Sequence, residues 1–197
     1  MSSPADEHRR IAGAFTAAVE GTAREAWDRP SPVEGLVARD VVRHLVEWFP
    51  AFLDGAVGIA LSAGPAVDDD PVGAWHTQTD AVQALLDDPD TARREHDLPH
   101  IGTMSLEQAT DMIYTSDVFL YRWDLARATG QDETLDPEKC AVMLEGMLPM
   151  DDMLRQSCQY GPRVHVADDA DVQAQLLAFI GRDPRCPSAP SGDTDRP

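Results

Sequence analysis

The residues of this chain most able to do chemistry lie in the run DVFLYRWDLARATG, which begins at Asp117. Asp117, Tyr121, Asp124 and Ala128 follow the spacing i, i+4, i+7 and i+11, which places them in one stripe along a helix. Apolar residues flank this stripe, so we expect it to face a core. A buried carboxylate needs a cation, a hydrogen-bond network or a raised pKa to offset the cost of its burial. The pattern therefore predicts a polar partner facing Asp117.

A second apolar helix face carries a single ionisable side chain, His44. The other members of this face are Val37, Val41, Leu45, Trp48 and Phe52. Neutral imidazole is the commonest protein ligand for zinc and similar ions, and a carboxylate on a facing helix is its natural companion. We expect a ring nitrogen of His44 and a carboxylate oxygen of Asp117 to lie within about 5 Å of each other. Two interpretations stay open from the residues alone: a shared metal, or a hydrogen-bonded core histidine with an Asp117 that is salt-bridged or solvated.

Two segments of the chain resemble a known protein family. They are PSPVEGLVARDVVRHLVEW, at residues 30–48, and DVFLYRWDLARATGQD, at residues 117–132. QYGPRV near Gln159 and LLAFIGRDP at residues 176–184 extend the likeness, which runs from about Ile11 to about Asp183. The chain resembles the mycothiol-dependent maleylpyruvate isomerase family. In particular, it is similar to the single-domain actinobacterial branch, whose members are described as DinB-like metal-binding proteins.

The resemblance implies an all-α fold, a DinB-like bundle of four main helices with one or two additional short helices. It also implies a divalent metal at the centre, with zinc the first expectation. One ligand would be His44, and an acid-x-x-x-His pair in the helix that ends WDLA would supply the other two. Asp117 matches the acid, but Tyr121 stands in the histidine position. The predicted metal-site residues are therefore His44, Asp117 and Tyr121.

The tyrosine at position 121 leaves three outcomes open. A phenol has an unperturbed pKa of about 10, so at neutral pH it is a poor anionic ligand unless a metal is already bound. Zinc prefers His, Cys and carboxylate donors, whereas iron accepts phenolate more readily. The site could be rebuilt with a Tyr ligand, bind metal weakly, or have lost its metal. Asp124 could accept a hydrogen bond behind the site, but capping or pairing with Arg127 is the favoured interpretation.

Two further departures from the family bear on the fold and on the reaction. Leu36 and Val37 replace the family's Trp and Thr before the His44 helix, and the missing Thr removes an N-cap worth about 1 kcal/mol if nothing replaces it. The maleylpyruvate isomerase itself has a C-terminal domain that contributes to its active site. We expect no such domain in this chain, so that specific reaction is not assigned.

Two classes of function fit these residues, and whether the protein is an enzyme stays open. In the first, a metal with open coordination positions lowers the pKa of a bound thiol or water and creates a nucleophile at neutral pH. The resemblance implies mycothiol as the cosubstrate, in thiol transfer or thiol-assisted isomerisation of a small-molecule substrate. The second class is a non-catalytic small-molecule-binding or stress-related bundle protein without a working metal site.

The composition predicts an acidic, cytoplasmic, single-domain protein. The 197 residues carry a formal net charge of −19, which argues against nucleic-acid and anionic-lipid partners because no basic patch is present to displace counterions from phosphate. No window approaches the roughly 18 apolar residues of a membrane span, and the start MSSPADEHRR lacks the apolar core of a signal peptide. Cys140, Cys158 and Cys186 show no CxxC spacing and no basic cluster that would favour a reactive thiolate. The family resemblance adds the expectation of a homodimer.

Helical periodicity dominates the chain, without strand alternation. A capping box formed by Ser105 and Gln108 predicts the start of the Asp117 helix, and Gly130 predicts its end. Pro50 predicts a kink in the His44 helix. We expect a bundle domain over residues 5–183 and a disordered Pro/Ser/Asp-rich tail over residues 184–197. The expected helices cover about residues 5–27, 37–61, 72–86, 105–129, 135–158 and 169–180.

The remaining histidines receive weaker assignments. His76 shares a helix with Trp75 and is the best spare metal ligand. His96, His100 and His165 are expected in surface loops, because Pro99 separates the first two and Gly161-Pro162 precedes the third. His8 lies in a polar N-terminal stretch and is given no functional role.

Overall fold

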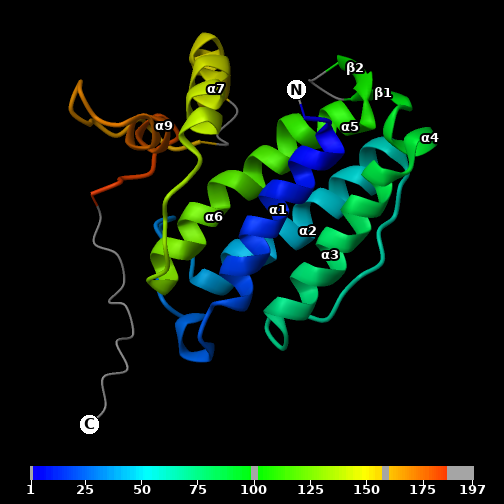
Figure 1. Cartoon of the computed structure of the whole chain (residues 1–197), viewed down its shortest axis with the longest axis horizontal. Helices are drawn as coiled ribbons and strands as arrows, with labels where there is room; N and C mark the ends of the chain where they lie inside the picture. Colours follow the sequence, from blue (N-terminus) through cyan, green and yellow to red (C-terminus); the bar gives the residue numbers. More distant parts are fainter. Residues whose placement is uncertain (1, 99–101, 157–159, 186–197) are drawn as a thin grey trace.

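Four long helices pack side by side in a bundle (Figure 1). In this computed structural model, α1 and α2 each contact both α3 and α6, so the four helices close a ring around a shared core. The mostly helical class expected from the sequence is therefore confirmed. The helices are α1 (Pro4–Glu20), α2 (Ala38–Val57), α3 (Pro71–Asp87) and α6 (Ser116–Thr129). The structure describes residues 2–98, 102–156 and 160–185.

Local capping explains where the first three helices begin. Ser3 and Asp70 each accept a backbone N–H three residues later, and proline follows both. Val37 offers no side-chain acceptor, but the Asp40 carboxylate accepts the Val37 backbone N–H at 3.0 Å. Asp40 thus supplies half of a capping box, although residue 37 is a valine. Helix α1 ends at Glu20 rather than at Trp27, and α2 ends at Val57 with Gly58 at φ 71°, earlier than expected.

The helix that carries Asp117 is the last part of a longer helical run. The predicted capping box of Ser105 and Gln108 is present at its start, and Gly130 ends it with φ 75°, as expected. Between α5 (Leu106–Ala109) and α6 the backbone forms a π-helical segment, Thr110–Thr115, which the sequence pattern does not predict. Such segments occur frequently at functional sites, and this one ends two residues before Asp117.

A short antiparallel hairpin follows the small helix α4 (Pro89–Ala92). Its strands are β1 (Glu95–Leu98) and β2 (Gly102–Ser105), with His96 opposite Met104. The expectation of a chain without strands is therefore wrong in this connection, as is the surface-loop assignment of His96, which lies half-buried in β1. His100 lies outside the described residues.

The chain after α6 forms a smaller group of helices beside the bundle (Figure 1). Helix α7 packs against α9, and a 3₁₀ turn at Leu148–Met150 separates α7 from α8, where a single helix was expected. Cys140 is buried in α7, whereas Cys158, Cys186 and the tail from residue 186 onward lie outside the described residues. The elements are α7 (Pro137–Met147), α8 (Asp151–Gln156) and α9 (Val172–Phe179).

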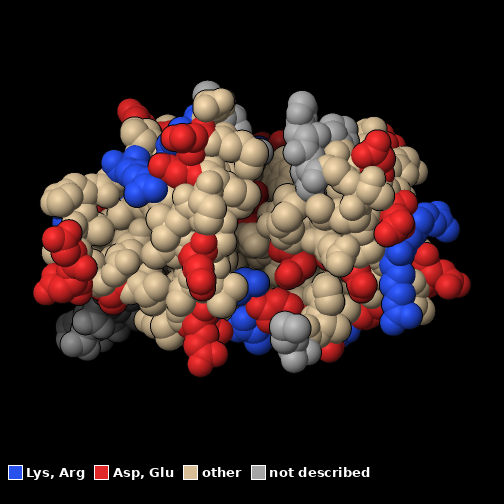
Figure 2. All heavy atoms as spheres, turned by 90° about the horizontal axis from the view of Figure 1, so that it is seen from above, with Lys and Arg blue, Asp and Glu red and all other residues tan. Residues whose placement is uncertain are grey.

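Large aromatic side chains fill the interior of the bundle. The Phe49 and Tyr114 rings stack with centroids 4.0 Å apart, and Phe15 packs against Trp75 at 4.5 Å. Acidic side chains spread over the face seen in Figure 2, which is hollowed near its middle. Among the described residues, no helix has the length and apolar character that crossing a membrane requires.

Candidate functional site

His44 on α2 and Asp117 on α6 meet where these two helices pack together. The Nε2 atom of His44 lies 3.7 Å from the Oδ2 atom of Asp117, which confirms the predicted proximity. The two side chains keep 38% and 23% of their surface exposed, so a solute can reach them. A histidine and a carboxylate thus face each other at a partly open position of the bundle wall.

Tyr121 lies one helical turn after Asp117 and packs against the same histidine. Its ring centroid lies 4.7 Å from that of His44. Burial, with a further contribution from the Asp117 charge, raises the pKa of Tyr121 to about 12, although the nearby Arg182 opposes this rise. At neutral pH Tyr121 is therefore a protonated phenol beside the His44–Asp117 pair.

Asp124, the next acid of the stripe, pairs with a cation far away in the sequence. Arg182, just after α9, donates Nη2 to Oδ2 of Asp124 at 3.0 Å and Nε to Oδ1 at 3.3 Å. The expected pairing of Asp124 with Arg127 is wrong, because Arg127 instead binds Glu133 at 2.5 and 2.7 Å. The Arg182 guanidinium carbon also lies 5.6 Å from the centroid of the Tyr121 ring.

These residues fit a divalent metal only in part. Two donors bound to one zinc ion at about 2.0–2.2 Å are roughly 3 to 3.5 Å apart, so the His44–Asp117 separation is close to that of a shared pair. Within the described part of the chain, no three His, Cys, Asp or Glu side chains gather as a metal-binding group. Tyr121 is protonated at neutral pH, which opposes its use as an anionic third ligand, although the nearby Arg182 favours the phenolate.

His76 on α3, the spare metal ligand expected from the sequence, does not reach the His44–Asp117 pair. His76 Nε2 lies 3.1 Å from Glu20 Oε1, and the two side chains are 41% and 55% exposed. The prediction of His76 as a spare ligand is therefore wrong, because its helix turns it outward toward the end of α1. His165 is exposed, as expected.

A buried histidine was missed by the sequence analysis. His8 is 0% exposed, its Nδ1 atom lies 2.9 Å from the Thr115 hydroxyl, and its ring stacks on Tyr114 with centroids 5.8 Å apart. Burial lowers the pKa of His8 to about 4, assisted by Arg9 and opposed by Asp87. The sequence does indicate that His8 is buried, since it precedes the apolar residues Ile11 and Phe15 at helical spacings of three and seven.

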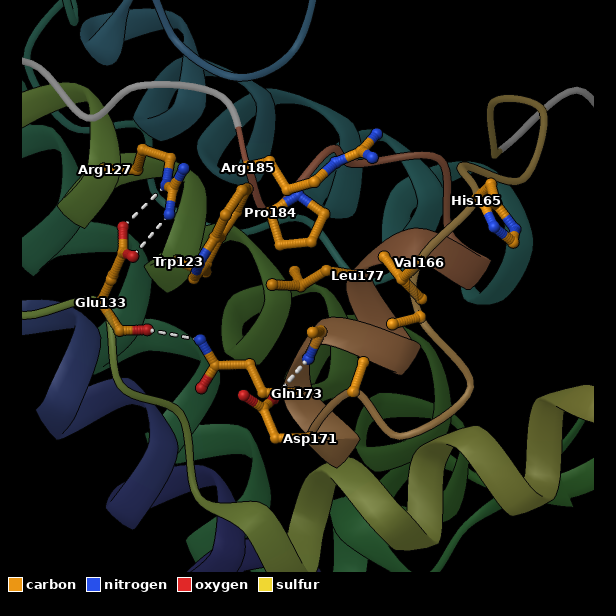
Figure 3. Close-up of a pocket in the computed structure, with 13 residues that line it drawn as sticks. Trp123, Arg127, Glu133, His165, Val166, Asp171, Gln173, Leu177, Pro184 and Arg185 are labelled. Carbon is orange, nitrogen blue, oxygen red and sulfur yellow. Dashed lines mark hydrogen bonds and ion pairs between the residues drawn. The ribbon is translucent and has the colours of Figure 1, made fainter.

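A pocket of about 600 Å³ lies beside residues 123–126, the WDLA run of α6, between this helix and the α9 segment (Figure 3). Trp123 and Leu177 contribute apolar walls, and the Arg127–Glu133 ion pair forms part of its polar edge. Gln173 helps to hold Glu133 in place, because its Nε2 atom donates to the Glu133 backbone carbonyl at 3.1 Å. A pocket of this volume, with both apolar walls and fixed polar groups, lies within the size range of small-molecule sites.

Fold and site together define a helical-bundle protein with a partly exposed His–Asp pair in its wall. The chain is similar to an uncharacterized protein of Mycobacterium tuberculosis strain H37Rv and to one of strain CDC 1551. Each is 26% identical over 186 residues, which cover 91% of this chain and 97% of the relative. No family model matches the chain, and no solved structure matches it.

Proposed function

We propose that the protein is a cytoplasmic, DinB-like bundle protein that binds a divalent metal, zinc first, through His44 and Asp117. The observation that supports this most is the 3.7 Å separation of the His44 Nε2 and Asp117 Oδ2 atoms, which project from facing helices. Tyr121 occupies the position where the resembled family has a histidine, and its protonated hydroxyl makes the binding weak. The proposed site consists of His44, Asp117 and Tyr121, the three positions that the family resemblance implies.

Each of the three side chains has a distinct role in this proposal. His44 would hold the ion through Nε2, and Asp117 would hold it through its carboxylate while balancing its charge. A bound divalent ion supplies a Lewis acid that lowers the pKa of a thiol or water. Tyr121 keeps its proton and would donate a hydrogen bond to an oxygen or sulfur atom of a molecule in the site. This arrangement suits a thiol cosubstrate such as mycothiol, in a transferase or isomerase reaction.

Metal content and affinity test the proposal. Protein purified without a metal-affinity tag should contain substoichiometric zinc by elemental analysis and bind added zinc reversibly. Asp117→Asn should weaken that binding at least tenfold, because it removes the anionic donor. Asp54→Asn, on the exposed face of α2, is the matched control and should bind like the wild type. Equal affinities of the wild type and Asp117→Asn would rule out the proposed site.

The pocket of about 600 Å³ beside Trp123 favours a second candidate, non-catalytic binding of a small molecule. Under this alternative the protein binds no zinc, and its ligand contacts Trp123 and Leu177. A small-molecule screen by protein NMR should then shift resonances of these residues. Ala174→Leu, which narrows the pocket from α9, should abolish those shifts, while zinc titration of the same protein should have no effect.

A further inference from the structure

The partly exposed aromatic side chains of this protein gather around Asp117. The chain has twelve Phe, Trp and Tyr residues, and eight of them are buried. The other four are half-buried, namely Trp48, Phe52, Tyr121 and Tyr160. A large ring left partly open to water forgoes some of the free energy that burial supplies, and contiguous exposed apolar surface often marks a ligand-binding groove. The position of these four rings is therefore informative.

Three of the four rings form a continuous strip with His44. On α2, the Trp48 ring centroid lies 6.0 Å from that of His44, and the Phe52 centroid lies 6.2 Å from that of Trp48. Across the helix interface, the Tyr121 centroid lies 4.7 Å from that of His44. We call these four residues the aromatic strip. Positions 44, 48 and 52 share one edge of α2 because they are four residues apart. The Asp117 carboxylate, 3.7 Å from His44, stands at the end of the strip.

Tyr160 comes from the chain after α8 and lies near the same carboxylate. Burial raises the pKa of Tyr160, and the Asp117 charge adds to that rise. Gly161, the next residue, packs backbone to backbone against Gly181, since a Cβ atom at Gly181 would lie only 2.9 Å from it. Gly181 precedes Arg182, which is anchored to α6. The segment after α8 is thereby held beside the helix that carries Asp117.

We propose that the aromatic strip binds a planar aromatic molecule that carries a hydroxyl group at one end. Its ring system lies along Trp48 and Phe52, and its hydroxyl donates a hydrogen bond to the Asp117 carboxylate. Aromatic pairs prefer centroid separations of about 4.5–7 Å, the spacing already present in the strip, so a ligand ring fits the same series. An aromatic carboxylate is disfavoured, because it has no proton to donate and would meet the negative charge of Asp117. The proposal rests on the proposed function for what happens to the ligand, whereas its binding needs no metal.

2-Naphthol is a suitable probe, used with metal-free protein so that the outcome does not depend on zinc. Decahydro-2-naphthol keeps the hydroxyl and the carbon skeleton but lacks aromatic faces, and 2-naphthoate carries a carboxylate in place of the hydroxyl. In a protein NMR titration, 2-naphthol should shift the side-chain resonances of Trp48 and Phe52. It should bind about two- to tenfold more tightly than the saturated alcohol, the worth of an aromatic contact beyond its buried area. It should also bind more tightly than 2-naphthoate.

The location of the shifts decides between the two possible positions of the probe. Shifts confined to Trp123 and Leu177 would place 2-naphthol in the pocket of about 600 Å³ and overturn the proposal. Equal binding of decahydro-2-naphthol would refute aromatic recognition. If 2-naphthol shifts Trp48 while zinc titration of the same protein has no effect, the proposed metal is wrong and the aromatic site stands.

Two variants test the two ends of the ligand. Phe52→Leu keeps an apolar side chain at a half-buried position, so it should fold, and it should weaken 2-naphthol binding roughly two- to fivefold without affecting decahydro-2-naphthol. Asp117→Asn removes the negative charge and should bring the affinity for 2-naphthoate close to that for 2-naphthol. Asp54→Asn, on the exposed face of α2, is the control and should bind all three compounds like the wild type. Unchanged affinities in both Phe52→Leu and Asp117→Asn would overturn the proposal.

Discussion

Arg182 and Asp124 form a bidentate ion pair that ties the chain after α9 to the buried stripe of α6. The Asp124 side chain is 1% exposed and that of Arg182 is 12% exposed. Burial raises the pKa of Asp124, and Arg182 opposes that rise. The pair therefore secures the C-terminal helices to the helix that carries Asp117 and Tyr121.

Asp124→Asn should destabilise the protein by about 3–5 kcal/mol, because it leaves the Arg182 guanidinium buried without its counter-charge. Urea denaturation followed by circular dichroism measures the change. Asp68→Asn is the control, since Asp68 pairs with Arg43 at 2.7 Å on the surface and its loss should change stability far less. Equal effects of the two substitutions would show that the Asp124–Arg182 pair contributes no more than a surface ion pair.

Tyr121→His should increase zinc affinity by at least about 10–100-fold. Loss of an outer-shell partner alone weakens metal binding by that factor, so the gain of a direct nitrogen ligand should strengthen it by at least as much. The substitution replaces a protonated phenol with a nitrogen donor and creates a His, Asp, His set with an open position. Competition titration against a zinc chelator measures both proteins directly.

Tyr121→Phe is the matched control for this titration, because it keeps the ring and removes only the hydroxyl. It should bind zinc like the wild type if the phenol does not coordinate. Equal affinities of Tyr121→His and the wild type would mean that position 121 does not face the site. If neither binds zinc, the small-molecule-binding function is favoured.

His8 should make the protein sensitive to mild acid. Because burial lowers its folded pKa to about 4 from an ordinary value of 6.5, the unfolded chain takes up the proton first as pH falls. The stability contribution is complete above pH 6.5 and is lost as pH falls toward about 4, by roughly 3 kcal/mol in total. His8→Gln should flatten this part of the stability profile, measured by urea denaturation at several pH values. Parallel profiles of the two proteins would contradict this account.

The homodimer expected from the family resemblance stays a prediction. Light scattering at tens of micromolar protein should give twice the 21.5 kDa chain mass. We expect the interface to include the exposed apolar side chains of α7, the 3₁₀ turn after it and α8, namely Val142, Leu148, Met150 and Met153. Met153→Asp should then reduce the mass to that of a monomer, while Asp54→Asn should leave it unchanged. A monomeric wild type would refute the prediction.

Sequence by itself determined the features that depend on near neighbours in the chain. The capping box at Ser105 and the end at Gly130 were predictable, because caps and turns form between residues a few positions apart. The meeting of His44 and Asp117 was also predictable, since His44 lies on an apolar helix face, Asp117 lies in a stripe flanked by apolar residues, and such faces turn inward together.

Tertiary structure alone decided which distant groups meet. Arg182 reaches Asp124 across 58 positions, and His8 reaches Thr115 across 107, and no local periodicity encodes either pairing. The Arg182–Asp124 contact holds a guanidinium next to the phenol of Tyr121. Helix propensity and capping act within a few residues, whereas the partner of a buried polar group is set by how whole helices pack.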